Sequence, residues 1–297
     1  MSGQTRFVIV DVFAEKRYAG NQLAVFQDVE SFSDDQMQAI AKEMHFSETT
    51  FILDNAMRDG GYDVRIFTPE SEVPFAGHPT LGTAFVIRQD LIAAPVETVV
   101  LNLKAGQIPV SVLPSDSGSD ILWMKQLNPV FGETIPISDM SNALGLENGD
   151  LDDRFPIQSV STGLPFFIVP VRSLEALKRA KVRLDAFFKI VESAEAKAVL
   201  LFCPEPYSPE NDLNVRVFVD WYGIPEDPAT GSGNGCLAGY LARHRYLGGS
   251  AINVQVEQGY EIGRPSLLYL KAADLGDSID VQVGGRVVMV ARGTLVT

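Results

Sequence analysis

The sequence is poor in cysteine and in positive charge, and each shortage excludes a class of protein. Its two cysteines, Cys203 and Cys236, are too few for a disulfide framework or a zinc ribbon. The 24 lysine and arginine residues are outnumbered by 38 aspartate and glutamate residues, so the formal net charge is −14. Phosphate backbones and anionic lipids repel such a chain. We therefore expect neither a nucleic acid nor a membrane as a partner.

Long apolar runs and a leader pattern are also missing. No uninterrupted hydrophobic segment approaches the ~18 residues that a membrane-spanning helix needs. The N-terminus has neither the basic start nor the apolar core of a signal peptide, which predicts a cytoplasmic protein. Of the three histidines, His45 and His244 have no Cys, His or Asp partners at ligand spacing, so we expect no metal site.

What the sequence does contain is an internal repeat. Its 297 residues are 46% hydrophobic, which is enough chain for about two domains of roughly 150 residues. The strand-like segment Val64–Phe67 reappears as Val215–Phe218. Each copy is followed by a polar, proline-bearing loop and then by a glycine, Gly77 or Gly231, that opens an apolar helix. We interpret this pattern as a duplication into two equivalent halves.

The repeated helices, expected at 77–87 and 231–241, are apolar on most sides, which is typical of buried helices. Most other patterned segments alternate like strands, and they do not alternate with helices as a doubly wound parallel sheet requires. The sequence therefore predicts an α+β fold with two pseudo-symmetric halves, each a mostly antiparallel curled sheet wrapped around a central buried helix. We expect an N-terminal half at 1–118, completed by a C-terminal strand at 286–297, a second half at 119–285, and a linker near 113–120. Surface helices are expected at 34–44, 174–180 and 184–191.

The two helix starts are the first candidates for chemistry. A helix N-terminus offers unpaired backbone N–H groups and a positive dipole end, which suit a carboxylate or the charge of a developing enolate. Alternatively, Gly77 and Gly231 only permit tight turns and close packing. Their repetition after the same strand and loop favours the first interpretation.

Polar residues at these starts have two interpretations each. His78 lies where a helix dipole disfavours imidazolium, so a neutral ring could donate to an oxygen or carry a proton, or it could be a structural hydrogen bonder. Asp227 and Ser232 flank the second start, as helix caps or as substrate ligands. Glu48 enters an apolar strand, where a carboxylate is costly unless it is paired or functional, although an exposed turn would also explain it.

Six segments resemble, in order along the chain, the PhzF-like isomerase family of phenazine biosynthesis, within the wider diaminopimelate-epimerase-like fold. They are Asp11–Phe13, Gly20–Val25, Ser47–Phe51, Gly77–Thr80, Glu226–Ser232 and Gly259–Ser266. The resemblance implies an active-site cleft between the halves. Gln22, where the family usually has proline, and the glycine-rich Gly233–Cys236 depart from the pattern.

The resemblance also implies roles for single residues. Glu48 becomes the general acid and base, and His78 and Asp227 assist it in catalysis. The residues implied to bind substrate are Asn21, Ser47, Gly77, Gly231 and Ser232. In the namesake reaction, a dihydro-hydroxyanthranilate loses a proton from one ring carbon and regains one at another, without metal or organic cofactor. The implied partners are a small carboxylate-bearing substrate and a second copy of the chain, in a homodimer.

Two other functions remain open. The chain could be a non-catalytic protein that binds a small metabolite. It could, alternatively, be an amino-acid epimerase, a class that in this fold uses two cysteines placed immediately before the helix-start glycines. Those positions are Ala76 and Thr230 here, which argues against a two-thiol mechanism. Cys236 lies inside the second helix, where we expect it to pack as a small hydrophobic residue.

Overall fold

The computed structural model describes residues 5–114 and 120–296, which form two compact units. Unit 1 comprises Met1–Met124 with Gly284–Thr297, and unit 2 comprises Lys125–Val283. The chain passes from one unit to the other within strand β8 (Ile121–Lys125) and returns within strand β16 (Ile279–Gly285). The predicted boundary at 118 and most of the predicted linker lie in 115–119, outside the described residues.

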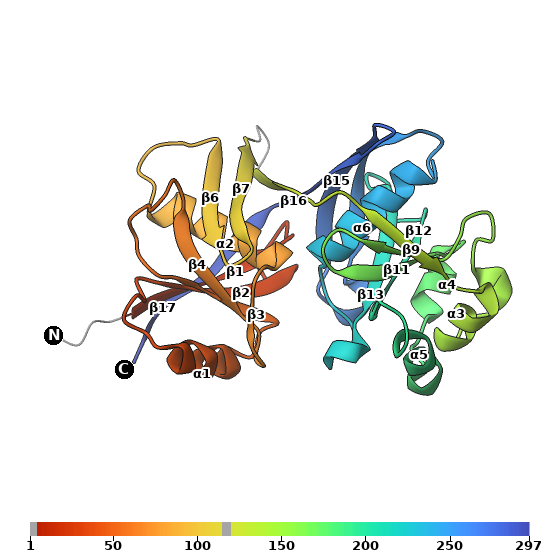
Figure 1. Cartoon of the computed structure of the whole chain (residues 1–297), viewed down its shortest axis with the longest axis horizontal. Helices are drawn as coiled ribbons and strands as arrows, with labels where there is room; N and C mark the ends of the chain where they lie inside the picture. The colour runs from red at the N-terminus through yellow and green to blue at the C-terminus, as the bar shows by residue number, and fades with distance from the viewer. Residues whose placement is uncertain (1–4, 115–119, 297) are drawn as a thin grey trace. The chain divides into compact units, whose positions relative to one another are not determined.

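Unit 1 is a mixed sheet curled around one helix (Figure 1). Along the sheet the strands follow the order β17, β1, β2, β3, β4, β6, β7, β8, with β5 paired to β4. The pairs β2–β3 and β4–β6 are parallel, and the other pairs in this order are antiparallel. The strands are β1 (Thr5–Val12), β2 (Asn21–Gln27), β3 (Glu48–Ile52), β4 (Tyr62–Phe67), β5 (Glu72–Val73), β6 (Thr98–Leu103), β7 (Gly106–Leu113) and β17 (Val287–Leu295).

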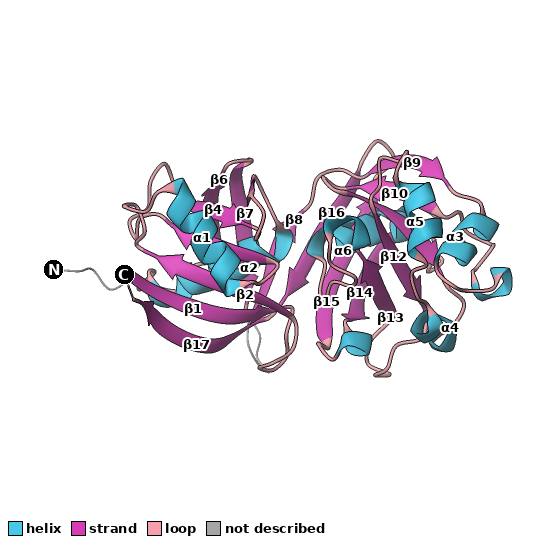
Figure 2. Ribbon diagram, turned by 90° about the horizontal axis from the view of Figure 1, so that it is seen from below, coloured by secondary structure: helices cyan, strands magenta, loops and turns pink. Residues whose placement is uncertain are grey.

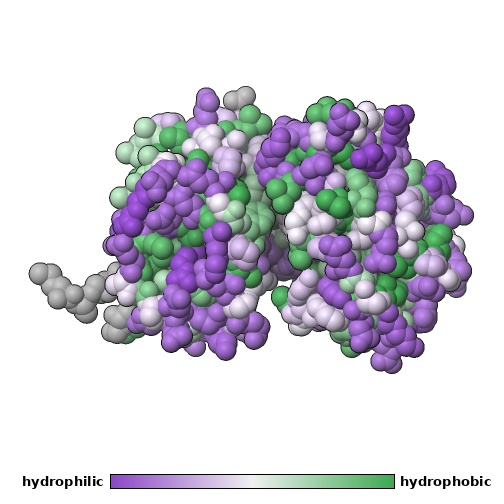
Figure 3. Space-filling view, viewed as in Figure 1, coloured by the Kyte–Doolittle hydropathy of each residue, from purple (hydrophilic) through white to green (hydrophobic). Residues whose placement is uncertain are grey.

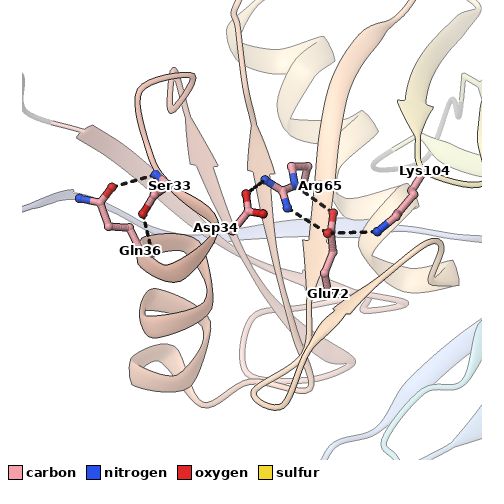
Figure 4. A network of polar contacts seen from close by, with 6 residues as sticks. All are labelled: Ser33, Asp34, Gln36, Arg65, Glu72 and Lys104. Atoms are coloured by element: carbon pink, nitrogen blue, oxygen red, sulfur yellow. Dashed lines mark hydrogen bonds and ion pairs between the residues drawn. The ribbon is translucent and has the colours of Figure 1, made fainter.

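Helix α2 (Gly77–Asp90) lies inside this sheet and packs against β1, β2, β3 and β6. Its apolar side chains are fully buried, as at Leu81 and Ile87. The close approach depends on Gly82, because a Cβ there would lie 2.6 Å from Leu23 Cδ2. Helix α1 (Asp34–Met44) begins instead with a capping box: Ser33 Oγ accepts from the Gln36 N–H and Gln36 Oε1 accepts from the Ser33 N–H (Figure 4).

Unit 2 repeats this plan around helix α6 (Gly231–Arg243), which packs against β10, β11, β14 and β15 (Figure 2). Its strands follow the order β9 to β15 along the sheet, and only the pairs β11–β12 and β13–β14 are parallel. The strands are β9 (Val130–Thr134), β10 (Gln158–Ser161), β11 (Pro165–Pro170), β12 (Ala198–Cys203), β13 (Leu213–Phe218), β14 (Ala251–Gln258) and β15 (Ser266–Asp274). The other helices are α3 (Ile137–Ala143), α4 (Leu174–Arg179), α5 (Leu184–Val191) and the 3-10 turns η1 (Asn148–Asp150), η2 (Asp220–Tyr222) and η3 (Tyr260–Ile262).

Strand pairing confirms the predicted duplication. The strands β1, β2, β3, β4, β6 and β7 pair in the same sequence of parallel and antiparallel steps as β10 to β15. The central helix follows β4 in one unit and β13 in the other. The halves differ in the helices that connect equivalent strands along the chain. Helix α1 connects β2 to β3 in unit 1, whereas α4 and α5 connect β11 to β12 in unit 2.

Hydrophilic residues cover much of the visible surface of each unit, and hydrophobic residues form smaller patches among them (Figure 3). Within residues 5–114 and 120–296, no helix has both the length and the apolar character needed to cross a membrane.

Candidate active site

The structure brings Glu48 and His78 together within unit 1. Glu48 is the first residue of β3, and His78 is the second residue of α2. Glu48 Oε2 lies 3.4 Å from His78 Nε2, and the two side chains are 19% and 7% exposed. The alternative of an exposed turn at Glu48 is therefore wrong. Two residues 30 positions apart in the sequence meet because the central helix starts beside the beginning of a sheet strand.

Burial keeps the His78 ring neutral. Desolvation lowers its pKa to about 3, and a hydrogen bond with the Gln22 backbone opposes this only in part. Because that bond favours the protonated ring, the ring donates it to the Gln22 carbonyl. Nε2 makes no hydrogen bond within the described residues, so we assign the ring proton to Nδ1. The Nε2 lone pair then faces the Glu48 carboxyl group, and one proton can be shared between them.

The neutral ring agrees with the sequence interpretation, but burial and not the helix dipole is the principal cause. We expect the His78 ring to show no titration by NMR between about pH 4.5 and 7.5, because its pKa lies below that range. A ring that titrates near its ordinary value of 6.5 would contradict this assignment.

The same shift makes stability depend on pH. In the unfolded chain His78 takes up a proton near pH 6.5, whereas in the folded chain it does so only near pH 3. Between these values the unfolded chain binds more protons, so the free energy of unfolding falls as pH falls, by up to about 1.4 kcal/mol per pH unit. Urea denaturation should show that His78→Asn weakens this dependence, while an unchanged slope would exclude His78 as its source.

The other residues proposed for unit 1 lie next to this pair in the sheet or the chain. Asn21 is the buried first residue of β2, two positions before Leu23, the register partner of Glu48. Ser47, which is partly exposed, directly precedes Glu48. Gly77 opens α2 after the N-cap residue Ala76, whose side chain makes no capping hydrogen bond. The N-cap residue therefore does not satisfy the first backbone N–H groups of α2.

Unit 2 presents Asp227 before the start of α6. Thr230 is the N-cap residue of this helix, and its side chain makes no capping hydrogen bond. Instead, its hydroxyl lies 2.5 Å from Asp227 Oδ2. Gly231 and Ser232 are the first two residues of α6, the former buried and the latter partly buried. The N-cap side chain itself thus contacts Asp227 and does not cap α6.

Two buried amides in unit 2 were not found from the sequence. Gln258, at the end of β14, donates from Nε2 to the Asp227 carbonyl at 2.8 Å and to Thr230 Oγ1 at 3.0 Å. Its Oε1 accepts from the Thr230 N–H at 3.2 Å and from Asn234 Nδ2 at 2.9 Å. Both amide side chains have no exposed surface. A polar residue inside an apolar strand or helix was the only sequence signal for either.

Neither cysteine can serve as an acid or a base at a helix start. The N-cap positions of α2 and α6 are Ala76 and Thr230. Cys236 is fully buried inside α6, with its Sγ 3.6 Å from Thr162 Oγ1, and burial raises its pKa to about 11. Burial likewise raises the pKa of Cys203 to about 12. A thiolate is the reactive form, so both thiols should be inert in the folded protein.

We therefore expect iodoacetamide to leave the native chain unmodified at neutral pH, and Cys236→Ala to keep kcat within about twofold of the wild type. Mass spectrometry with and without urea distinguishes protection by folding from an unreactive reagent. Rapid alkylation of the native chain with loss of turnover would favour a thiol mechanism.

Within the described residues, no three His, Cys, Asp or Glu side chains gather closely enough to hold a metal ion. Unit 1 thus presents a Glu–His pair beside the start of α2, and unit 2 separately presents an Asp–Thr pair beside the start of α6.

Known proteins share both the sequence and the fold. A family model described as phenazine biosynthesis-like protein, PhzC-PhzF, matches residues 10–293. A trans-2,3-dihydro-3-hydroxyanthranilate isomerase of Pseudomonas aeruginosa is 34% identical over 289 residues, which cover 97% of this chain and 98% of the relative. The crystal structure of a PhzF-family phenazine biosynthesis protein of Bacillus anthracis, 26% identical, matches with a TM-score of 0.91 over 99% of this chain and 100% of that one.

A hydroxyproline epimerase of Agrobacterium vitis shares the fold alone. It is 12% identical, and the two structures match with a TM-score of 0.59 over 98% of this chain and 91% of that one. The resemblance seen in six short segments therefore extends along the chain. The chain belongs to the phenazine biosynthesis-like family, PhzC-PhzF, has an epimerase-like α+β fold, and is an isomerase.

Proposed function

We propose that this isomerase moves a proton between two carbons of a small carboxylate-bearing metabolite by general acid and base catalysis, without a cofactor. The observation that carries the proposal is the Glu48–His78 pair, whose facing atoms lie 3.4 Å apart in a largely buried setting. A carboxylate is a suitable proton carrier for such a shift. The relative from Pseudomonas aeruginosa, named for isomerising trans-2,3-dihydro-3-hydroxyanthranilate, supports this class of reaction.

In the proposed reaction, the Glu48 carboxylate takes a proton from one carbon, and the electron pair of the broken C–H bond delocalises into the substrate. The protonated Glu48 can donate to the Nε2 lone pair of neutral His78, which keeps the acid oriented. Glu48 then returns the proton to a second carbon, so nothing is oxidised or reduced. The reaction needs only that charge be stabilised while the proton is on the enzyme.

We propose that the starts of α2 and α6 supply that stabilisation. Both begin with glycine, and the N-cap side chain satisfies the first N–H groups of neither, so in this proposal these groups donate to a carboxylate or to an enolate oxygen. In this proposal Asp227, Ser232, Asn21 and Ser47 supply further polar contacts to the substrate. The overall negative charge of the chain gives the substrate no general attraction, so these local donors must hold it.

A non-catalytic metabolite-binding protein is the alternative with the same site residues. Adding trans-2,3-dihydro-3-hydroxyanthranilate to the protein and following its resonances by NMR separates the two. A catalyst consumes the compound in more than stoichiometric amounts, whereas a binder only broadens or shifts its signals. If neither occurs, the named compound is not the substrate, and solvent-deuterium exchange into other small amino and hydroxy acids would test the reaction class itself.

The proposal also includes a cytoplasmic homodimer, as the family resemblance implies. Light scattering of the purified chain should give twice the 32.4 kDa mass of one copy. A monomer at micromolar concentration would contradict the dimer without affecting the proposed chemistry.

A further inference from the structure

A chain of three hydrogen-bonding groups leads from the end of β14 to Asp227. Gln258 Nε2 donates to Thr230 Oγ1 at 3.0 Å, and the Thr230 hydroxyl lies 2.5 Å from Asp227 Oδ2. Gln258 is fully buried and Thr230 is 9% exposed, while Asp227 is partly exposed. Buried polar groups thus support a carboxylate that can still reach solvent or a ligand.

The direction of each hydrogen bond follows from backbone groups that can act only as a donor or only as an acceptor. The backbone N–H of Thr230 can only donate, so the Gln258 atom that it contacts at 3.2 Å must be the acceptor Oε1. The carbonyl of Asp227 can only accept, so the atom that it contacts at 2.8 Å must be Nε2. These two bonds leave one orientation for the Gln258 amide. Asn234 Nδ2, which donates to the same Oε1 at 2.9 Å, agrees with it.

With the amide oriented this way, Gln258 donates to the Thr230 oxygen. The hydroxyl proton of Thr230 is then directed to Asp227 Oδ2, where an ionised carboxylate accepts it. Successive donors aligned in this manner polarise one another and strengthen the last bond. A hydroxyl that donates to a carboxylate also favours its ionised form over the protonated one.

The first half of the molecule has no such chain, although its backbone follows the same plan. In β4–β6 the register pairs Asp63 with Asn102, and in β13–β14 it pairs Asn214 with Glu257. The next residue is Leu103 in the first half and Gln258 in the second. The helix N-cap is likewise Ala76 in the first half and Thr230 in the second. Building a central helix into this sheet therefore does not require an amide and a hydroxyl at these places.

We propose that Thr230 and Gln258 are positioning residues, which hold the Asp227 carboxylate ionised and in one orientation toward the substrate. They act through Asp227 and do not react themselves. This inference rests on the proposed function, because it assumes that Asp227 contacts the substrate. It assigns to Thr230, at the position where epimerases of the fold carry a cysteine, a task other than proton transfer.

The test compares Thr230→Val with Thr230→Ser. Valine keeps the shape of threonine but has no hydroxyl, whereas serine keeps the hydroxyl and loses only a methyl group. We expect Thr230→Val to lower kcat/KM by about 10- to 100-fold, because a misoriented contact group costs about this much. We also expect the acidic limb of its pH profile to move to higher pH, since Asp227 then protonates more easily. Thr230→Ser should restore both properties to near the wild-type values.

A purely structural Thr230 would change the melting temperature but leave the pH profile in place, and that result would overturn the inference. Should Thr230→Val not fold, Gln258→Leu serves instead, because leucine stands at the equivalent place of β6, as Leu103, and it removes the Nε2 donor without adding a charge. We expect the same upward movement of the acidic limb, and an unchanged limb would overturn the inference.

Asp227→Asn distinguishes failure of the proposed role of Asp227 from failure of the positioning role of Thr230 and Gln258. If it retains full activity, the assumed role of Asp227 fails. If it is inactive while Thr230→Val behaves as the wild type, only the positioning role fails.

Discussion

Glu48→Gln should lower kcat by about 10³-fold while the chain folds as before. The amide has nearly the shape of the carboxyl group and can donate to His78 Nε2, so the contact with the neutral ring is kept. It cannot accept a proton from carbon or return one. The loss should therefore appear in kcat, with little change in the affinity for the substrate.

The matched control is Glu43→Gln, which makes the same chemical change at an exposed position of α1. It should be active. Glu48→Asp adds a second comparison, because it keeps a carboxylate but withdraws it by one methylene, so activity should fall less than in Glu48→Gln. Circular dichroism and melting temperature verify the fold. Turnover by Glu48→Gln within tenfold of the wild type would remove Glu48 from the role of proton carrier.

Arg216→Met should lower the free energy of unfolding by about 3–5 kcal/mol, because it leaves a buried carboxylate without its partner. Arg216 Nη2 lies 2.8 Å from Glu226 Oε2 and Nε lies 3.0 Å from Glu226 Oε1. The two side chains are 9% and 7% exposed. Arg216 Nη1 also donates to the carbonyls of Leu177 and Ala180 at the end of α4. The substitution removes all of these bonds at once.

The duplication supplies an internal control for this prediction. Arg65 occupies the corresponding place in β4 and forms the same bidentate ion pair with Glu72, with both N–O distances 2.9 Å (Figure 4). Its pair is more exposed, at 22% and 19%, and Asp34 and Lys104 join the network. Arg65→Met should therefore cost only about 1 kcal/mol.

Urea denaturation of both variants measures the difference directly. Equal losses would mean that burial does not control the strength of this pair. Because Glu226 immediately precedes Asp227, Arg216→Met should also reduce activity in the folded protein, whereas Arg65→Met should not. A fully active and fully stable Arg216→Met would contradict both expectations.

Much of the fold was predictable because the duplication repeats a local pattern. A strand such as Val64–Phe67, a polar loop and a glycine before an apolar helix are each visible in sequence and occur twice. The predicted helices at 34–44, 77–87 and 231–241 are found as α1, α2 and α6, the latter two being one turn or less longer. Strands β2, β5 and β8 to β10 and helix α3 were not predicted as such, because short segments carry too few residues to establish a period.

The candidate site was predictable only residue by residue. The sequence pointed to Glu48 and His78 separately. Their contact depends on the parallel register of β2 and β3 and on the packing of α2 against these two strands. The sequence placed Asp227 near a helix start, as a cap or as a substrate ligand, but did not show its contact with the hydroxyl of Thr230. Gln258 was missed because its function depends on three bonds to residues about 30 positions away, which no local pattern records.

The most direct test of the proposed proton transfer is turnover in D2O followed by NMR. With trans-2,3-dihydro-3-hydroxyanthranilate as substrate, we predict a product that carries deuterium at the newly protonated carbon. The label enters when the proton held by Glu48 exchanges with the solvent before Glu48 transfers it to that carbon. We predict that Glu48→Gln gives neither product nor exchange. Product formed with the same deuterium content by the wild type and by Glu48→Gln would contradict the role of Glu48 as the group that moves the proton.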